Sequence, residues 1–189
     1  MPRSAVSTRE RVLRAADRLW GEHGLRGVSL AAIAREASVT KPAVYYYFAD
    51  KSALLTAVVT SVLEQHGAAL RRAARGATAR ERLIGALGYL VSARCNGPRL
   101  LRDGGVALTV DQTSQARGAF FRQFFSPVQQ ILDDGVRSGE LRRVDTAFTT
   151  QALLNLVDPW TGREPPPGGR DATQLATEIV SLVVDGLAT

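Results

Sequence analysis

Apolar residues recur along this chain at the three- and four-residue spacing of α-helices. Several of the predicted helices begin at a residue whose side-chain oxygen can accept a hydrogen bond from a free N–H group of the first turn, as Thr78 does. The predicted fold class is therefore all-α, with about nine helices. They cover residues 7–23, 29–37, 40–48, 51–74, 78–94, 99–103, 114–136, 145–160 and 171–187.

The second and third of these helices are short and are joined by a tight turn at Ser38 and Val39. In the third helix Val44 and Phe48 lie one turn apart, so both are predicted to face inward. The opposite face is predicted to point outward, and it carries Lys41, Pro42, Tyr45 and Tyr46.

An exposed face with two tyrosines and a lysine favours a binding partner. An α-helix fits the major groove of DNA, and residues near its N-terminus then reach the edges of the bases. The sequence therefore predicts that this helix reads DNA. The alternative is a helical hairpin whose tyrosines pack on a neighbouring domain.

Asp50 and Lys51 follow the reading helix, and Asp50 is predicted to cap the next helix. Lys51 then falls in the first turn, where the positive end of the helix dipole disfavours a cation by about 0.3–1 kcal/mol. A phosphate at the helix start would reverse that sign. Lys51 is therefore predicted to contact the DNA backbone, although lysines also occur at helix starts by chance.

The stretch Thr8 to Leu55 resembles the DNA-binding domain of TetR-family repressors, most closely from Val39 onward. The family pattern is a helix-turn-helix followed by a spaced tyrosine, phenylalanine and lysine. Those places are held here by Tyr45, Phe48 and Lys51. Ser38 departs from the pattern, because the family most often has glycine in the turn.

The resemblance implies a three-helix DNA-binding domain over residues 1–50 and an effector-binding and dimerisation domain over 51–189. It also implies a repressor that binds a near-palindromic operator as a dimer and is released by a small, largely apolar effector. The residues predicted to contact DNA are Ser29, Thr40, Lys41, Pro42, Ala43, Tyr45, Tyr46 and Lys51.

Net charge supports the DNA hypothesis through its distribution. The chain has 189 residues and a net charge of +6. Residues 1–51 hold nine Lys and Arg against five Asp and Glu, whereas the remaining 138 residues hold fifteen against thirteen. The basic excess is thus concentrated where DNA is expected to bind. The alternative is an arginine-rich sequence with no acidic partner.

Other features of the sequence narrow the function classes. The chain has one cysteine and two histidines, so neither an internal disulfide nor a metal site is expected. No Ser/His/Asp set, Walker loop, HExxH or CxxC motif is present. No cofactor is therefore expected, and a small helical enzyme or ligand carrier is the alternative function. The N-terminus lacks a signal peptide and no apolar run reaches the length of a membrane span, so a cytoplasmic protein without membrane contact is expected.

Phenylalanines cluster on the predicted helix 114–136, where Pro127 should produce a kink. An irregular helix packs less evenly than a straight one, so an apolar effector cavity is predicted against the helix 78–94. The alternative is that these residues are ordinary core. The predicted ligand-binding residues are Leu87, Val91, Arg94, Cys95, Phe121, Phe124, Phe125 and Asn155.

The last helix is apolar on two sides, so it needs two neighbours. One is its own core, and the other is predicted to be a second subunit that completes a four-helix contact. The predicted interface residues are Phe148, Ala152, Leu156, Ile179, Leu182, Val183 and Leu187. Residues 167–187 also resemble family members that sense acyl-CoA thioesters, which makes an acyl-CoA or another lipophilic molecule the expected effector.

Overall fold

The computed structural model describes residues 7–93, 108–160 and 169–185, and these contain helices and no strand. The all-α prediction is confirmed over these ranges. The short helix expected at 99–103 lies outside the described residues. Packing divides the chain into two compact units, Met1–Val62 with Asn96–Ala119, and Leu63–Cys95 with Phe120–Thr189. The predicted boundary after residue 50 separates a DNA-binding domain from an effector-binding domain by their functions, and it stays a prediction.

The first unit begins with α1 (Thr8–Gly27), α2 (Leu30–Glu36) and α3 (Lys41–Tyr47). Their N-caps are the predicted ones, since the side chains of Ser7, Ser29 and Thr40 accept hydrogen bonds from the first turns. Helix α2 packs on both α1 and α3. The core between them is closed by Val12, Leu13, Ala16, Trp20, Ile33, Ala34, Val44 and Phe48.

The turn between α2 and α3 places Ser38 in the left-handed region, with φ at 54°. The N–H of Val39 donates to the carbonyl of Ala34 at 2.9 Å, and the N–H of Ser38 donates to that of Arg35 at 3.1 Å. This pair of bonds is a Schellman motif, which satisfies the last carbonyls of α2. The motif requires a positive φ at the residue after the C-cap, which here is Ser38. Serine therefore holds this position under strain.

We expect Ser38→Gly to stabilise the protein by about 0.5 kcal/mol. A left-handed conformation costs an L-residue about 1–2 kcal/mol, while glycine loses about 0.4–1 kcal/mol through the flexibility of its unfolded chain. Chemical denaturation with a fluorescence readout measures the difference. The control is Ser38→Ala, which keeps the strain and should not stabilise; an equal gain in both variants would contradict the strain argument.

Helix α4 (Lys51–Ala73) begins in the first unit and continues into the second. By length and composition it could cross a membrane, contrary to the expectation that no such segment exists, but half of its most apolar window is buried within the protein. Its buried apolar side chains recur at helical spacing: Leu54, Leu55, Val58, Val59, Val62, Leu63 and Leu70. The composition of α4 is thus that of a core helix.

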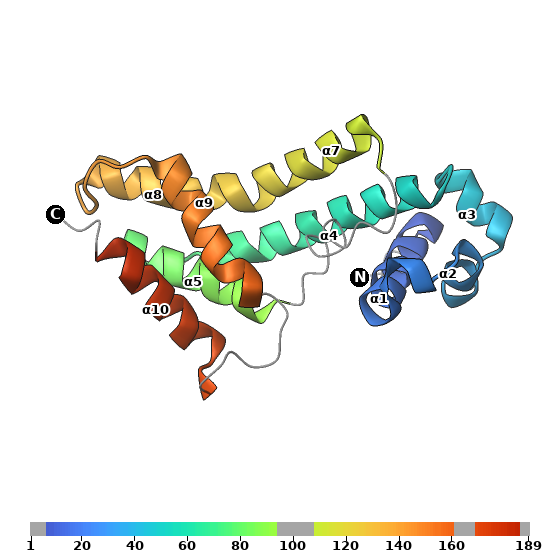
Figure 1. Cartoon of the computed structure of the whole chain (residues 1–189), viewed down its shortest axis with the longest axis horizontal. Coiled ribbons are helices and arrows are strands. Elements are labelled where there is room, and N and C mark those ends of the chain that lie inside the picture. Colours follow the sequence, from blue (N-terminus) through green and yellow to red (C-terminus); the bar gives the residue numbers. More distant parts are fainter. Residues whose placement is uncertain (1–6, 94–107, 161–168, 186–189) are drawn as a thin grey trace, which may run out of the picture. The chain divides into compact units, whose positions relative to one another are not determined.

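The second unit contains the rest of α4 with α5 (Ala79–Ser92), α8 (Ser126–Ser138), α9 (Thr146–Val157) and α10 (Ala172–Val184). A three-residue 3₁₀ turn, η2 (Asp158–Trp160), follows α9. Helix α10 lies along α5, and α8 packs against both α5 and α9 (Figure 1). The predicted N-caps of these helices are confirmed at Thr78, Asp145 and Asp171.

The predicted helix 114–136 is three consecutive elements. Helix α7 (Val110–Phe120) begins four residues earlier than predicted, and a π-turn, η1 (Phe121–Phe125), joins it to α8. Pro127 has no N–H to donate four residues back, and the turn before it is widened, so that the N–H of Ser126 bonds to Phe121. The irregularity lies where the proline predicts it. Phe121 is exposed as a result, whereas Phe124 is buried.

Gly67 lets the π-turn approach α4 within the second unit. A Cβ atom built at Gly67 would lie 2.7 Å from the Cβ of Gln123, which is too close for two carbon atoms. The side-chain oxygen of Gln123 accepts a hydrogen bond from Arg71 at 3.0 Å. Gly67 does not interrupt α4, which continues through it. Its role in the structure is close packing.

His66 lies beside Gly67 on α4, and its Nδ1 atom is 2.6 Å from the hydroxyl of Tyr89. Burial lowers the pKa of His66 from its ordinary value of 6.5. The unfolded chain therefore binds more protons than the folded chain below that value, and stability increases with pH in this range.

We expect the free energy of unfolding to fall as the pH drops from 6.5 toward the lowered pKa of His66, and to be level above 6.5. Denaturation curves between about pH 5.5 and 7.5 measure this slope. The slope should be reduced in His66→Gln and kept in His23→Gln, whose parent residue is exposed on α1. An unchanged slope in His66→Gln would contradict the assignment.

Candidate nucleic-acid interface

The outward face of α3 carries the residues that the sequence analysis placed there. Tyr46 is 83% exposed and Tyr45 is 47% exposed, and Lys41 and Pro42 are exposed beside them. The ammonium of Lys41 lies 5.8 Å from the centre of the Tyr45 ring, a cation–π distance. This seven-residue helix therefore presents aromatic and cationic groups to solvent on one side.

The inward face fixes the orientation of that surface. Val44 is fully buried and Phe48 almost so, as predicted. The guanidinium of Arg9, on α1, lies over the Phe48 ring at 5.5 Å. A helix of seven residues has little stability by itself, so these contacts with the rest of the unit hold α3 in place.

Tyr47 also belongs to the exposed surface, although it is not among the residues predicted to contact DNA. Its ring packs edge-to-face on Tyr46, with ring centres 5.0 Å apart. Ala43, which was selected, lies one turn earlier on the same side of the helix. That spacing was the signal that could have identified Tyr47.

The bonds that cap α2 and α3 use the hydroxyl oxygens of Ser29 and Thr40 as acceptors and leave the hydroxyl hydrogens available to a phosphate. The hydroxyl oxygen of Ser29 accepts from the N–H of Ala32 at 3.2 Å, and that of Thr40 accepts from Ala43 at 3.3 Å. Both side chains are exposed, and in each the hydroxyl hydrogen is not used by these bonds. Helix N-termini also attract phosphates through their N–H groups.

Lys51 has partners that the sequence did not suggest. Its Nζ atom donates to the carbonyl of Leu25 at 2.6 Å and to that of Val28 at 2.7 Å, and burial lowers its pKa. These carbonyls lie after Gly24, where a φ of 72° interrupts α1. The cation at the start of α4 is explained by these bonds without a phosphate. An ammonium has three donors, so a backbone contact by Lys51 stays a prediction.

The cap of α4 is confirmed. The Oδ1 atom of Asp50 accepts from the N–H of Ala53 at 2.7 Å and from the hydroxyl of Ser52 at 2.6 Å. The hydrogen bond from Ser52, and to a smaller extent that from Ala53, lowers the pKa of the Asp50 carboxyl.

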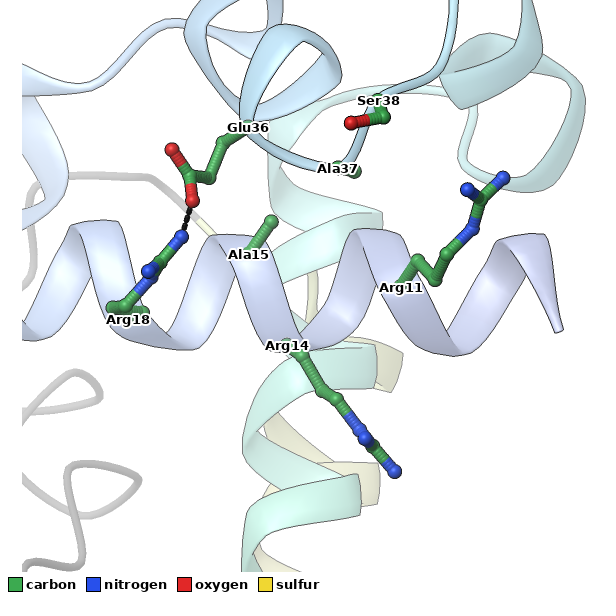
Figure 2. Close-up of a pocket in the computed structure, with 7 residues that line it drawn as sticks. All are labelled: Arg11, Arg14, Ala15, Arg18, Glu36, Ala37 and Ser38. Atoms are coloured by element: carbon green, nitrogen blue, oxygen red, sulfur yellow. Dashed lines mark ion pairs between the residues drawn. The ribbon is translucent and has the colours of Figure 1, made fainter. Parts of the chain in front are cut away.

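A surface hollow of about 500 Å³ lies between α1 and the end of α2, and it is lined by Arg11, Arg14, Ala15, Arg18, Glu36, Ala37 and Ser38. Arg18 forms an ion pair with Glu36 across it, while Arg14 points to the other side of α1 (Figure 2). Basic side chains beside the C-terminus of α2 complement its dipole. This charged hollow is not the predicted apolar effector cavity, which stays a prediction.

The predicted ligand-binding residues that the structure describes all belong to the second unit. Leu87, Val91 and Phe124 are in its core, and the rings of Phe121 and Phe125 stack at 4.9 Å. The Asn155 side chain is exposed and accepts from Gln151 at 2.9 Å, so it needs no buried partner. Arg94 and Cys95 lie outside the described residues.

The predicted interface residues divide by exposure. Phe148 and Leu182 are 73% and 74% exposed, and Leu156 is exposed about two helical turns after Phe148. Ala152 and Val183 are partly exposed, whereas Ile179 is buried within the unit. Leu187 lies outside the described residues. Helices α9 and α10 pack on each other, so each contributes exposed apolar residues to the surface of one unit.

Known proteins show similarity over both the motif and the whole chain. The family model for "Bacterial regulatory proteins, tetR family" matches residues 12–58. The HTH-type transcriptional regulator BetI of Agrobacterium fabrum is 30% identical over 181 residues, which is 95% of this chain and 74% of that protein.

Two solved structures share the fold. FadR of Bacillus subtilis in complex with stearoyl-CoA has a TM-score of 0.75 at 20% identity, covering 94% of this chain and 98% of FadR. AibR in complex with isovaleryl coenzyme A and operator DNA has a TM-score of 0.68 at 19% identity, covering 94% of this chain and 98% of AibR.

Proposed function

The chain belongs to the TetR family of bacterial regulatory proteins, and on that premise we propose that it is a dimeric repressor whose α3 helices read an operator. It acts in the cytoplasm, and a small, largely apolar effector releases it from DNA. It works by binding and not by turnover.

The exposed face of α3 carries this proposal. Two tyrosines and a lysine project from a helix whose other side is buried, and exposed aromatic side chains favour a partner that covers them. Tyrosine and lysine combine apolar contact with hydrogen bonds to bases and phosphates. In this role Thr40, Lys41, Pro42, Ala43, Tyr45 and Tyr46 contact the duplex, and Ser29 and Lys51 approach phosphates.

The dimer is proposed from the exposed apolar side chains of α9 and α10. Phe148, Leu156 and Leu182 are large and leave apolar area in water in a single chain. A twofold interface would bury these side chains on both subunits. A dimer also presents two α3 helices, which is why we propose a near-palindromic operator.

The effector is proposed to be an acyl-CoA or another lipophilic molecule. FadR and AibR, which share this fold, are in complex with stearoyl-CoA and isovaleryl coenzyme A. In this chain α5 packs on α8, and the stacked Phe121 and Phe125 lie directly before α8. An acyl chain between α5 and η1–α8 would contact apolar side chains. Such a ligand releases DNA only as far as it prefers the conformation that does not bind DNA.

Selection of bound fragments from random double-stranded DNA tests the function directly. We expect enrichment of an inverted repeat, and the enriched DNA should bind less tightly as salt increases, because lysine and arginine displace counterions from phosphates. The Tyr45→Ala variant, carried through the same selection, is the control for DNA retained by charge alone. Recovery of no common sequence by the wild-type protein would contradict the proposal.

A further inference from the structure

The side chain of Gln112, on α7, forms a hydrogen bond with the start of α4. The Nε2 atom of Gln112 donates to the hydroxyl oxygen of Ser52 at 3.1 Å, and the two residues are 60 positions apart. Both lie in the first compact unit. The same glutamine also closes the N-terminus of α7, since its Oε1 atom accepts from the N–H of Thr109 at 2.9 Å and Thr109 in turn caps Gln112 at 3.2 Å.

The contact continues beyond Ser52. The Ser52 hydroxyl accepts from Gln112 and donates its own hydrogen to Asp50 at 2.6 Å, and Asp50 caps α4 through Ala53. The Ser52 hydroxyl thus acts as acceptor in one bond and as donor in the next, and consecutive hydrogen bonds of this kind strengthen one another. The cap of α7 is thereby connected to the cap of α4.

The start of α4 is the point where the reading helix is attached. Asp50 is three residues after Tyr47, the last residue of α3. Lys51, next to it, is bound to the carbonyl of Leu25, near the end of α1, and to that of Val28, the residue after α1. The first turn of α4 therefore fixes the direction in which the chain leaves α3, relative to the other helices of the unit.

We propose that Gln112 is a positioning residue for DNA recognition: its bond to Ser52 holds the Asp50 cap, and through it α3, in the orientation that binds the operator. This inference rests on the proposed function. It makes α7 a regulatory element, because any change that withdraws Gln112 lowers operator affinity without touching the DNA-contacting residues. Along the chain α7 continues directly into η1, which carries predicted effector-binding residues.

Gln112→Glu separates this role from helix capping. Glutamate keeps the oxygen that accepts from Thr109, as glutamate and glutamine both do in capping boxes. It cannot donate to Ser52, and it adds a negative charge beside Asp50. Ser52→Ala removes the same connection from the other side and leaves the bond between Asp50 and Ala53.

The test is a double-mutant cycle on operator affinity, with DNA obtained by the selection described above. Each single variant should bind about tenfold more weakly, and the double variant should lose less than the product of the two single losses, because both remove one connection. Thermal unfolding of each variant should shift little. In addition, hydrogen exchange of the amides of residues 109–113 in the wild-type protein should slow when operator is added, since coupling is reciprocal.

Two results would overturn the inference: operator affinity unchanged in both single variants, or additive losses that follow a loss of thermal stability. Either result leaves the proposed function intact, provided that the wild-type protein binds operator and Tyr45→Ala does not. If the wild-type protein binds no DNA sequence selectively, the proposed function itself has failed.

Discussion

Tyr45→Ala is expected to abolish operator binding by a protein that remains folded and dimeric. The Tyr45 side chain is about half exposed on the outward face of α3, so its removal leaves no cavity in the core. A good base contact contributes about 1–3 kcal/mol, and a dimer loses two of them, so affinity should fall at least about 30-fold. Fluorescence anisotropy with labelled operator measures the loss.

The neighbouring residue provides a matched control. Val44 is fully buried beneath the same turn of α3, so Val44→Ala should lower the free energy of unfolding by about 1–3 kcal/mol through lost burial and an unfilled space. Its folded fraction should still bind operator. The proposal that the exposed face reads DNA would be wrong if Tyr45→Ala retained wild-type affinity, or if the two variants lost affinity in parallel with stability.

The double variant Phe148→Glu/Leu182→Glu is expected to be monomeric. Both side chains are large and nearly three-quarters exposed on α9 and α10, so a charge at either position costs the single chain little. In a twofold interface four carboxylates would be buried without partners. Each uncompensated charge costs several kcal/mol, and the dimer dissociation constant should rise by more than about 1,000-fold.

Analytical ultracentrifugation over a range of protein concentrations measures this change, and operator affinity should fall with it. Val110→Glu is the control, because Val110 is 86% exposed on α7 and outside the predicted interface. It should leave the oligomeric state unchanged. A double variant that sediments like the wild-type protein would show that the exposed residues of α9 and α10 serve another contact.

Local features of this chain could be predicted well from the sequence. The caps at Ser29, Thr40 and Asp50 act over three residues, so the sequence alone contains both partners of each bond. The inward position of Val44 and Phe48 follows from helical spacing in the same way. These features are enough to predict the orientation of the exposed surface of α3.

Contacts between distant segments could not be predicted. Lys51 has a motif position that suggests a phosphate, but its hydrogen bonds run to carbonyls 23 and 26 residues earlier. The Gln112–Ser52 bond joins two polar residues that no pattern connects. Phe121 fits an apolar stripe only if the helix is regular, and the π-turn before Pro127 shifts the register. Such outcomes depend on packing.

Helix α3 has seven residues, and at 1.5 Å per residue it extends only about 10 Å along a groove in which base pairs are stacked about 3.4 Å apart. One α3 helix can therefore contact about four base pairs, and a given four-base-pair sequence recurs by chance about every 250 positions. The two α3 helices of a dimer together specify about eight base pairs, a sequence found by chance about once in 65,000 positions. Such a sequence is common on the scale of a genome. Specific binding to a single promoter thus requires more than these two half-sites. The additional specificity would come from the shape of the intervening DNA or from additional copies of the protein bound side by side.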